Sequence, residues 1–251
     1  KSSKREVREV RDENRGAIKI QIQNATLDNN SLILGFNESL FNIMKIKAYF
    51  YFDIISPYAY FFLKSRKVLE DRLEIIPTPI FFPGLLRLQD NRGPAEVPEK
   101  RIYTYQFCVW KAQKLKLPFQ FPKRHPFVSI PAQRLLLQHH ADLTMLDKAF
   151  DFVWAQGHDP ELEWEEFCVA IGLPKNTPKP QDETIKKALI ESTQTAANHG
   201  VFGVPSIRID QQIFWGVDSI DWILEYLTKP EMFSEKEYQA VHSIINPLIE
   251  K

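Results

Sequence analysis

The sequence is poor in the residues that mark several classes of protein. Only two of its 251 residues are cysteines, Cys108 and Cys168, and they form no CxxC motif. This argues against a disulfide scaffold and a cysteine zinc site, and it favours a reducing compartment, for which the cytoplasm is the simplest choice. The histidines show no metal-binding spacing such as HExxH, so we expect no metal site.

Net charge and long apolar runs are also lacking. The 32 basic residues balance the 32 acidic ones, so we expect neither nucleic acid nor an anionic membrane as a partner. No apolar run approaches the roughly 18 to 20 residues that span a bilayer. The first fifteen residues are mostly charged, unlike a secretory signal. By contrast, 44% of the residues are hydrophobic, which suffices for a sizeable core in one domain with a large insertion or in two small domains.

The segment before residue 44 differs from the rest. Residues 1–15 mix charges of both signs with few apolar residues, which is typical of a solvated or disordered arm. Met44 precedes the first clear strand pattern, so we predict an N-terminal extension over residues 1–43 and a folded domain over residues 44–251. Alternating apolar residues at 18–22 leave open an accessory strand within the extension.

From residue 45 onward the patterns alternate between strand and helix. A strand at 45–53, a helix at 57–70 and a strand at 73–80 predict a βαβ unit with parallel strands. After the Phe-Pro-Gly sequence at 82–84 the pattern becomes helical, with helices expected at 98–117, 131–140, 145–156, 161–171 and 182–198. A hairpin at 206–209 and 212–215 follows, and then helices at 219–227 and 234–248.

This order of elements predicts an α/β fold. It matches a thioredoxin-like fold, formed by residues 44–82 and 200–251, that is interrupted by an all-helical insertion subdomain at 83–199. In the first helix of the insertion, Ile102, Tyr105, Val109 and Ala112 lie on one face.

The chain is organised around the stretch at residues 49–60, where an apolar strand runs into a helix. Ser56 suits the N-cap position, and Pro57 suits the first helical turn. The free N–H groups and the dipole at a helix N-terminus favour negative charge, so a hydroxyl there is well placed to meet an anion. Taken alone, a Ser-Pro pair is typical of a simple helix cap.

Four stretches resemble the 2-hydroxychromene-2-carboxylate isomerases, which are relatives of the kappa-class glutathione transferases. They are FDIISPY at 52–58, NRGPAEVP at 91–98, GVFGVPS at 200–206 and FWGVD at 214–218, in the order and spacing of the family over residues 45–227. The resemblance implies a glutathione-dependent protein with Ser56 where a thioredoxin-like oxidoreductase has its reactive cysteine. A serine forms no mixed disulfide, so thiol–disulfide exchange at this position is excluded.

The same resemblance implies roles for individual residues. Ser56 would donate a hydrogen bond to the thiolate of glutathione, and Val204, before a cis-Pro205, would pair with its cysteinyl backbone. Asp218 would meet the γ-glutamyl ammonium group. The helix N-terminus at Ser219, where the kappa class has an arginine, would hold the γ-glutamyl carboxylate. The remaining candidates are Asn91 for glutathione, and Tyr58, Phe82, Lys100 and Trp154 for the substrate.

The implied activity belongs to aromatic catabolism. It is a cis–trans isomerisation of the 2-hydroxychromene-2-carboxylate to trans-o-hydroxybenzylidenepyruvate type, in which a thiolate adds reversibly and glutathione acts as a cofactor. The expected partners are a small aromatic oxo acid and, by analogy with relatives, a second copy of the chain. Two alternatives stay open: a kappa-type glutathione transferase or peroxidase, and a non-catalytic glutathione-binding protein. Residues 127–130 depart from the polar pattern of the family, which leaves the substrate open.

We expect no functional role for the remaining clusters of polar residues. The basic run at 123–125 is expected to be a solvated loop. The histidines at 139, 140, 158 and 199 are expected to lie on the surface or to be satisfied by hydrogen bonds.

Overall fold

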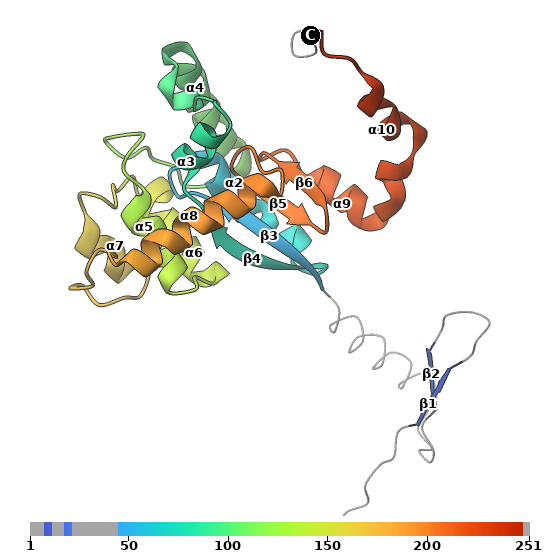
Figure 1. Ribbon diagram of the computed structural model, residues 1–251. Coiled ribbons are helices and arrows are strands. Elements are labelled where there is room, and N and C mark those ends of the chain that lie inside the picture. Colours follow the sequence, from blue (N-terminus) through green and yellow to red (C-terminus); the bar gives the residue numbers. More distant parts are fainter. Residues whose placement is uncertain (1–7, 12–17, 22–44, 248–251) are drawn as a thin grey trace, which may run out of the picture. The chain divides into compact units, whose positions relative to one another are not determined.

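The computed structural model of the protein describes residues 8–11, 18–21 and 45–247, in two compact units, Lys1–Lys45 and Ile46–Lys251. In the first unit β1 (Arg8–Arg11) pairs antiparallel with β2 (Ile18–Gln21) (Figure 1). The strand that alternation left open is therefore present as β2. The prediction of an irregular arm is wrong for β1, a short and mostly charged strand that pairs with the next strand along the chain, and the rest of that arm lies outside the described residues.

A four-stranded mixed sheet forms the centre of the second unit, with the order β4-β3-β5-β6. Its strands are β3 (Ile46–Phe52), β4 (Leu73–Pro79), β5 (Ser206–Ile209) and β6 (Gln212–Trp215). β3 runs parallel to β4 and antiparallel to β5, and β5 and β6 form the hairpin. The predicted parallel βαβ unit and the predicted hairpin are both confirmed.

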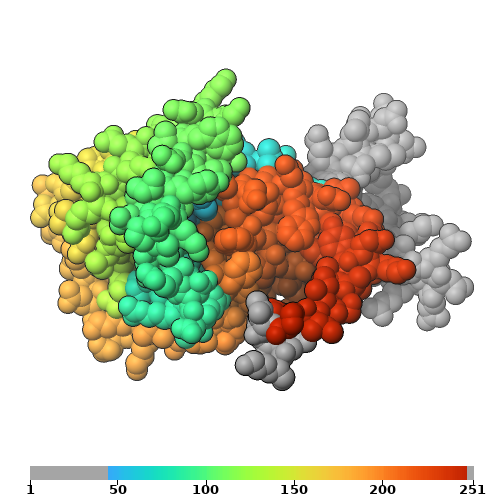
Figure 2. Space-filling view, turned by 90° about the horizontal axis from the view of Figure 1, so that it is seen from above, coloured from blue at the N-terminus to red at the C-terminus, as the bar shows by residue number. Residues whose placement is uncertain are grey.

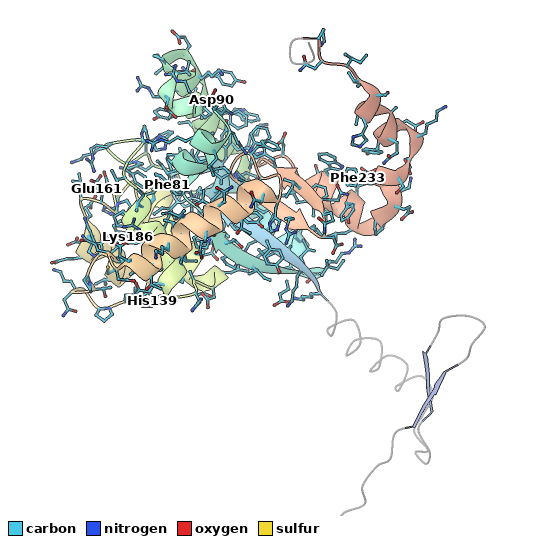
Figure 3. The ribbon with its side chains drawn as sticks, in the orientation of Figure 1. Phe81, Asp90, His139, Glu161, Lys186 and Phe233 are labelled. Carbon is cyan, nitrogen blue, oxygen red and sulfur yellow. The ribbon has the colours of Figure 1, made fainter. Side chains whose placement is uncertain are left out.

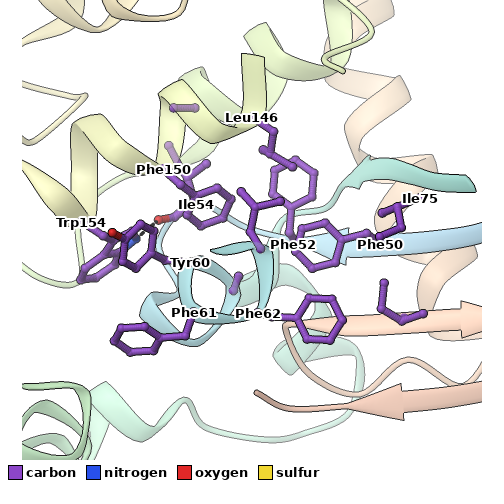
Figure 4. Close-up of a cluster of buried hydrophobic side chains, with 14 of the residues drawn as sticks. Phe50, Phe52, Ile54, Tyr60, Phe61, Phe62, Ile75, Leu146, Phe150 and Trp154 are labelled. Carbon is purple, nitrogen blue, oxygen red and sulfur yellow. Dashed lines mark hydrogen bonds between the residues drawn. The ribbon is translucent and has the colours of Figure 1, made fainter. Parts of the chain in front are cut away.

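The core is unusually aromatic where β3 meets the helix that follows it. That helix, α2 (Pro57–Ser65), continues into η1 (Arg66–Leu69) and buries most of its side chains. Phe50 stacks on Phe52 and on Phe62, with ring centroids 5.4 Å apart in each pair. Figure 4 shows these rings packed between the sheet and the helices, with Phe150 of the insertion closing the cluster. Burying such rings supplies much of the hydrophobic stabilisation of this unit.

The chain between β4 and β5 is helical, as the sequence predicted. Its elements are α3 (Phe82–Leu88), η2 (Pro94–Glu96), α4 (Pro98–Leu115), α5 (Ile130–Gln138), α6 (Leu143–Phe150), the π-helical turn η3 (Asp151–Ala155), α7 (Trp164–Ala170) and α8 (Glu183–Asn198). The sequence did not predict α3, because a Pro-Gly pair ordinarily marks a loop. Pro83 instead occupies the first turn of this helix, where proline is tolerated.

α4 extends away from the sheet (Figure 1). It buries only Cys108 and Ala112, whereas Ile102 and Val109 are exposed. The sequence predicted a buried face from the spacing of apolar residues, and this predicted face differs from the face that is buried in the structure.

The C-terminal segment differs from its prediction. After α9 (Ile220–Thr228) come η4 (Pro230–Ser234), α10 (Lys236–Ala240) and η5 (Val241–Ser243). The single helix predicted at 234–248 with Ser234 as its cap is wrong, since Ser234 ends η4 and α10 has only five residues. The apolar residues Val241, Ile244 and Ile245 are exposed, and a helix without a buried face gains little from packing.

Ion pairs fasten the insertion to α2. Lys64 contacts Asp147 at 3.0 Å and Asp151 at 2.9 Å, and Arg66 contacts Asp147 at 2.7 Å. Within the described ranges, none of the helices has the length and apolarity needed to cross a membrane.

Candidate functional site

Ser56 occupies the N-cap of α2, directly after the central strand. Its backbone is extended, and its Oγ accepts a hydrogen bond from the N–H of Ala59 at 3.3 Å. Its hydroxyl also donates to the carbonyl oxygen of Val204 over a long 3.5 Å. The side chain is 7% exposed. A hydroxyl held so loosely at a helix mouth is free to turn toward an anion.

The loop that faces Ser56 contains a cis peptide bond between Val204 and Pro205, as the sequence predicted. Two contacts hold this loop, since Ser206 Oγ donates to the carbonyl oxygen of Gly203 at 2.8 Å and the Gly216 N–H donates to that of Pro205 at 3.0 Å. Among the described residues, no hydrogen-bond acceptor is found for the Val204 N–H. This donor is therefore available to an extended ligand.

Asp218 and Ser219 follow β6 on the same side of the fold. The Asp218 side chain folds back over Gly216, whose φ is +98°, so that a Cβ at position 216 would lie 2.6 Å from Asp218 Oδ1. Asp218 itself is exposed. Ser219 is buried at the start of α9 and donates from its Oγ to the Gly216 carbonyl oxygen at 2.8 Å. Its hydroxyl is thus already used, and only the helix N-terminus is free for an anion.

Tyr58 lies in α2 and contacts α4. Burial raises the pKa of Tyr58 to about 12, with a further rise from nearby Cys108 and a small one from Asp218, while a hydrogen bond with Thr104 opposes the rise. Its ring meets Phe107 of α4 edge-on at 5.6 Å. Tyr58 therefore stays a neutral hydrogen-bond donor at ordinary pH, on the side of the site where α4 and Asp218 approach.

Figure 2 shows a crevice between the teal and green surface of α3 and α4 and the neighbouring orange surface of the C-terminal part of the second unit. Blue atoms from the beginning of the second unit are visible at its floor. α3 and α4 form one wall of this crevice, and the C-terminal part of the second unit forms the other.

Asn91 and Lys100 lie in the segment around α3 and α4 and are exposed. Asn91 Oδ1 accepts a hydrogen bond from the N–H of Arg92 at 2.8 Å, and no hydrogen bond or ion pair in the described residues joins Asn91 or Lys100 to Ser56. Phe82, by contrast, is half-buried and lies beside the turn before Ser56, because its N–H donates to Asp53 at 3.0 Å.

Trp154 has a different position from the one predicted. Its side chain is fully buried, it stacks on Phe119 with centroids 5.9 Å apart, and its Nε1–H donates to the carbonyl oxygen of Ile54 at 2.8 Å (Figure 4). The expected substrate contact is corrected on this ground, since an enclosed indole offers no surface to a substrate. Trp154 instead holds the turn that leads into Ser56.

Gln133 holds the same turn from a second side and was missed by the sequence interpretation. It is fully buried, and its Oε1 accepts from the Ile54 N–H at 3.2 Å. Its Nε2 donates to the carbonyl oxygens of Phe52 at 2.9 Å and Ile80 at 2.8 Å, where β3 and β4 end. One amide thereby fixes the ends of both parallel strands relative to the turn.

His125 completes the set. Within the predicted solvated loop, Lys123 and Arg124 are exposed, and only His125 departs from the prediction. Its Nε2 lies 2.8 Å from the carbonyl oxygen of Ile55, and its Nδ1 lies 2.7 Å from the hydroxyl of Tyr105. Burial lowers the pKa of His125, although the bond to Ile55 opposes this. The neutral ring therefore donates from Nε2 to Ile55 and accepts from Tyr105. Its neighbour Arg124 forms an ion pair with Asp159 at 2.7 Å.

Asp53 lies three residues before Ser56 and is fully buried. Its Oδ1 accepts from the Ile55 N–H at 3.1 Å, and its Oδ2 accepts from the Phe82 N–H and from Ser129 Oγ, each at 3.0 Å. Burial raises the pKa of Asp53 to about 6, and the three hydrogen bonds limit the rise. A sequence signal existed, because a carboxylate at the end of an aromatic strand must be partnered when buried.

The surroundings of Ser56 suit the binding of an anion. Neither cysteine of the protein supplies a reactive thiol. Both cysteines are buried, and burial raises the pKa of Cys108 to about 12 and also raises that of Cys168. A thiol with such a pKa is not a nucleophile at neutral pH. The described residues contain no group of three or more side chains arranged to hold a metal ion. Any thiolate chemistry at Ser56 therefore needs a thiol from a ligand.

Comparison with known proteins identifies the class. The sequence matches the DSBA-like thioredoxin domains over residues 48–228, and the chain belongs to this family. The predicted thioredoxin-like α/β fold with its helical insertion is confirmed.

The chain is also similar to individual proteins of known name. The glutathione S-transferase kappa 2 of Caenorhabditis elegans is 27% identical over 207 residues, covering 72% of this chain and 91% of the relative. The 2-hydroxychromene-2-carboxylate isomerase of Sphingobium xenophagum is 29% identical over 194 residues, covering 71% and 96%. A solved 2-hydroxychromene-2-carboxylate isomerase has the same fold, with a TM-score of 0.64 and 20% identity over 79% of this chain and all 100% of that one. The resemblance drawn from the four motifs is thus confirmed.

Proposed function

We propose that the protein binds glutathione at Ser56 and uses its thiolate to isomerise an aromatic ring-cleavage product. The observation that carries the proposal is the contact of Ser56 with the cis-Val204–Pro205 loop at 3.5 Å. It joins a hydroxyl and a helix N-terminus to a backbone edge that suits a short peptide. The relation to an isomerase and to glutathione transferases adds support.

Each part of glutathione has a partner in this proposal. The sulfur lies at the mouth of α2, where Ser56 Oγ–H leaves its long bond to Val204 and donates to the thiolate. The cysteinyl backbone pairs with the Val204 N–H. The γ-glutamyl ammonium group meets Asp218, and the γ-glutamyl carboxylate meets the start of α9 at Ser219. Asn91 is the proposed contact on the other wall of the crevice.

The reaction divides into two easier steps. The thiolate adds to the conjugated double bond of an unsaturated 2-oxo acid, the resulting single bond rotates in the enolate, and the thiolate leaves as the double bond re-forms. Glutathione is regenerated. Tyr58, which burial keeps protonated, is our proposed donor to the enolate oxygen, Phe82 is the proposed apolar contact for the aromatic ring, and Lys100 stays a candidate for the substrate carboxylate.

The balance of thiol during turnover tests this proposal. With substrate isomers of the hydroxybenzylidenepyruvate type, absorbance should report their interconversion while free thiol stays constant. Ser56→Ala should lower kcat by at least about tenfold, because one donor to the thiolate is lost. Asp71→Asn, at an exposed position before β4 and away from the proposed contacts, is the control and should leave the rate unchanged.

A second candidate is a kappa-type glutathione transferase, which the kappa relative favours. In that case free thiol would disappear in step with product, and a stable conjugate would accumulate. Saturable glutathione binding with neither reaction would instead identify a non-catalytic binding protein.

We also propose a cytoplasmic location and a homodimer. The two free, buried cysteines agree with a reducing compartment. Sedimentation velocity of the full chain would distinguish a dimer from a monomer, and a monomer over the whole micromolar range would refute the dimer.

A further inference from the structure

A groove runs between α3, α5 and α8, and none of the proposed glutathione contacts lines it. Its volume is about 330 Å³, which is the lower end of the range for sites that hold small ligands. Figure 3 labels Phe81, at the start of α3, and Lys186, on α8, which stand at its two sides. Apart from Phe81, the groove is lined by residues of the helical insertion.

Most of the groove is apolar and open. Its walls include Phe81, Leu88, Ile130, Leu189 and Ile190. Leu88 is 52% exposed and Ile190 is 66% exposed, so two large aliphatic side chains on facing helices stand in solvent at its rim. Aliphatic surface of this kind gains free energy when a hydrocarbon covers it.

One cation in the groove lacks an anionic partner. The Nε of Arg134 is buried without a hydrogen bond, and its Nη1 reaches only the Pro180 carbonyl oxygen at 3.5 Å. No carboxylate in the described part of the chain lies within 4.0 Å of this guanidinium. The other cation, Lys186, is already paired with Glu183 at 2.7 Å. A half-buried guanidinium offers a planar pair of donors that matches a carboxylate.

We propose that this groove binds a straight-chain monocarboxylate, with the carboxylate on Arg134 and the hydrocarbon tail along Leu88 and Ile190. The size of the groove favours this occupant over a second copy of the chain, since stable protein interfaces bury about 800 Å² on each partner. The hydroxyl of Thr193 takes no part, because it already donates to Leu189 and accepts from Phe81. The ligand is thus recognised by one charge and a long apolar contact.

Calorimetric titration of the full chain with decanoate, below its micelle concentration, tests the proposal. Decanoate should bind once per chain, and decanol, which has the same tail without the charge, should bind at least about tenfold more weakly. Arg134→Gln should weaken decanoate binding by a similar factor. Ile190→Glu should abolish it, because a carboxylate at the rim repels the ligand. The matched control is Val169→Glu, an aliphatic residue of α7 that is 55% exposed and should leave binding unchanged.

Three results would overturn the proposal: no saturable decanoate binding to the wild type, equal affinity for decanol, or unchanged binding by Ile190→Glu. If Arg134→Gln fails to fold by circular dichroism, the pair of glutamate variants decides alone, because both change exposed residues. A dimer that Ile190→Glu splits, with no decanoate binding by either form, would assign the groove to a second copy and also overturn the proposal.

Discussion

Asp53 is a carboxylate that the fold encloses completely, three residues before Ser56. Its three donors come from the turn itself, from the start of α3 and from Ser129. They compensate only part of the cost of burial, so its pKa is about 6 instead of 3.8. The residue therefore ties three segments together, and its ionisation above that pH costs free energy.

This residue should make stability depend on pH. The folded state holds the Asp53 proton more tightly than the unfolded state, so the free energy of unfolding gains from it below about pH 4 and loses that gain as pH rises through about 6. The rise of the pKa from 3.8 to about 6 corresponds to about 3 kcal/mol. Urea unfolding between pH 4 and pH 8 should show this slope in the wild type.

Asp53→Asn is the decisive variant for that slope. Its free energy of unfolding should no longer fall between about pH 4 and pH 6, so its deficit relative to the wild type should be largest near pH 4 and shrink as the pH rises through about 6. Asp71→Asn, at an exposed position before β4, is the control and should keep the slope. An unchanged slope in Asp53→Asn would show that another group causes it.

At the scale of elements, α2 is held to α6 by charges as well as by aromatic rings. Asp147 accepts from both Lys64 and Arg66, and the three side chains are only 13 to 28% exposed. Removing Asp147 leaves Lys64 with Asp151 and Arg66 with Glu70 as their remaining partners, so each partly buried cation loses one of its two carboxylates.

Asp147→Asn should therefore lower the free energy of unfolding by about 1 to 3 kcal/mol. Glu165→Gln is the comparison, because its pair with Lys175 is 60 to 65% exposed and should be worth less than about 1 kcal/mol. Chemical denaturation of both variants measures the difference. Equal effects would mean that the cluster contributes no more than a surface pair.

The sequence predicted the elements whose signals are local. β3, α2 and the hairpin have clear periodicity, and the Ser56 cap lies within four residues of its partner. α3 was missed because its Pro-Gly pair is typical of a loop, and the contact that fixes its start, from the Phe82 N–H to Asp53, joins residues 29 positions apart. The C-terminal helix was wrong because its propensity is not supported by a buried face.

In the candidate site, too, residues within sequence motifs were predicted and residues held by distant partners were not. Ser56, Val204, Pro205 and Asp218 stand in motifs and were predicted. Gln133 and His125 were not, because a buried amide or imidazole has no periodic signature, and its partners come from distant elements. Trp154 was noticed for its motif but given the wrong role, since burial cannot be read from a single aromatic residue.

At the scale of the whole molecule, glutathione should stabilise the folded chain by mass action. A ligand at 100 times its Kd adds about 2.7 kcal/mol, which for a domain of this size raises Tm by roughly 5 to 10 °C. Asp218→Ala should remove most of this shift because the γ-glutamyl ammonium group loses its partner. Differential scanning fluorimetry with millimolar glutathione measures it.

S-methylglutathione separates the sulfur from the rest of that effect. It should still stabilise the wild type, but less than glutathione does, and Ser56→Ala should remove the difference between the two ligands. The control Asp71→Asn should keep the full shift. The absence of any shift in the wild type would contradict glutathione binding, whereas loss of decanoate binding would leave this prediction untouched.

The hydrogen bonds around Ile54 and Ile55 also bear on how the protein folds. Gln133, Trp154 and His125 are 79, 100 and 70 positions away from their partners in this turn, and Ser56 is 148 positions from Val204. Closing loops of that length is slow and comes late in folding, after local helices and hairpins have formed. The turn before Ser56 and its contact with Val204 therefore form only after most of the chain has been folded into place, so any ligand that needs both would bind only the completed fold.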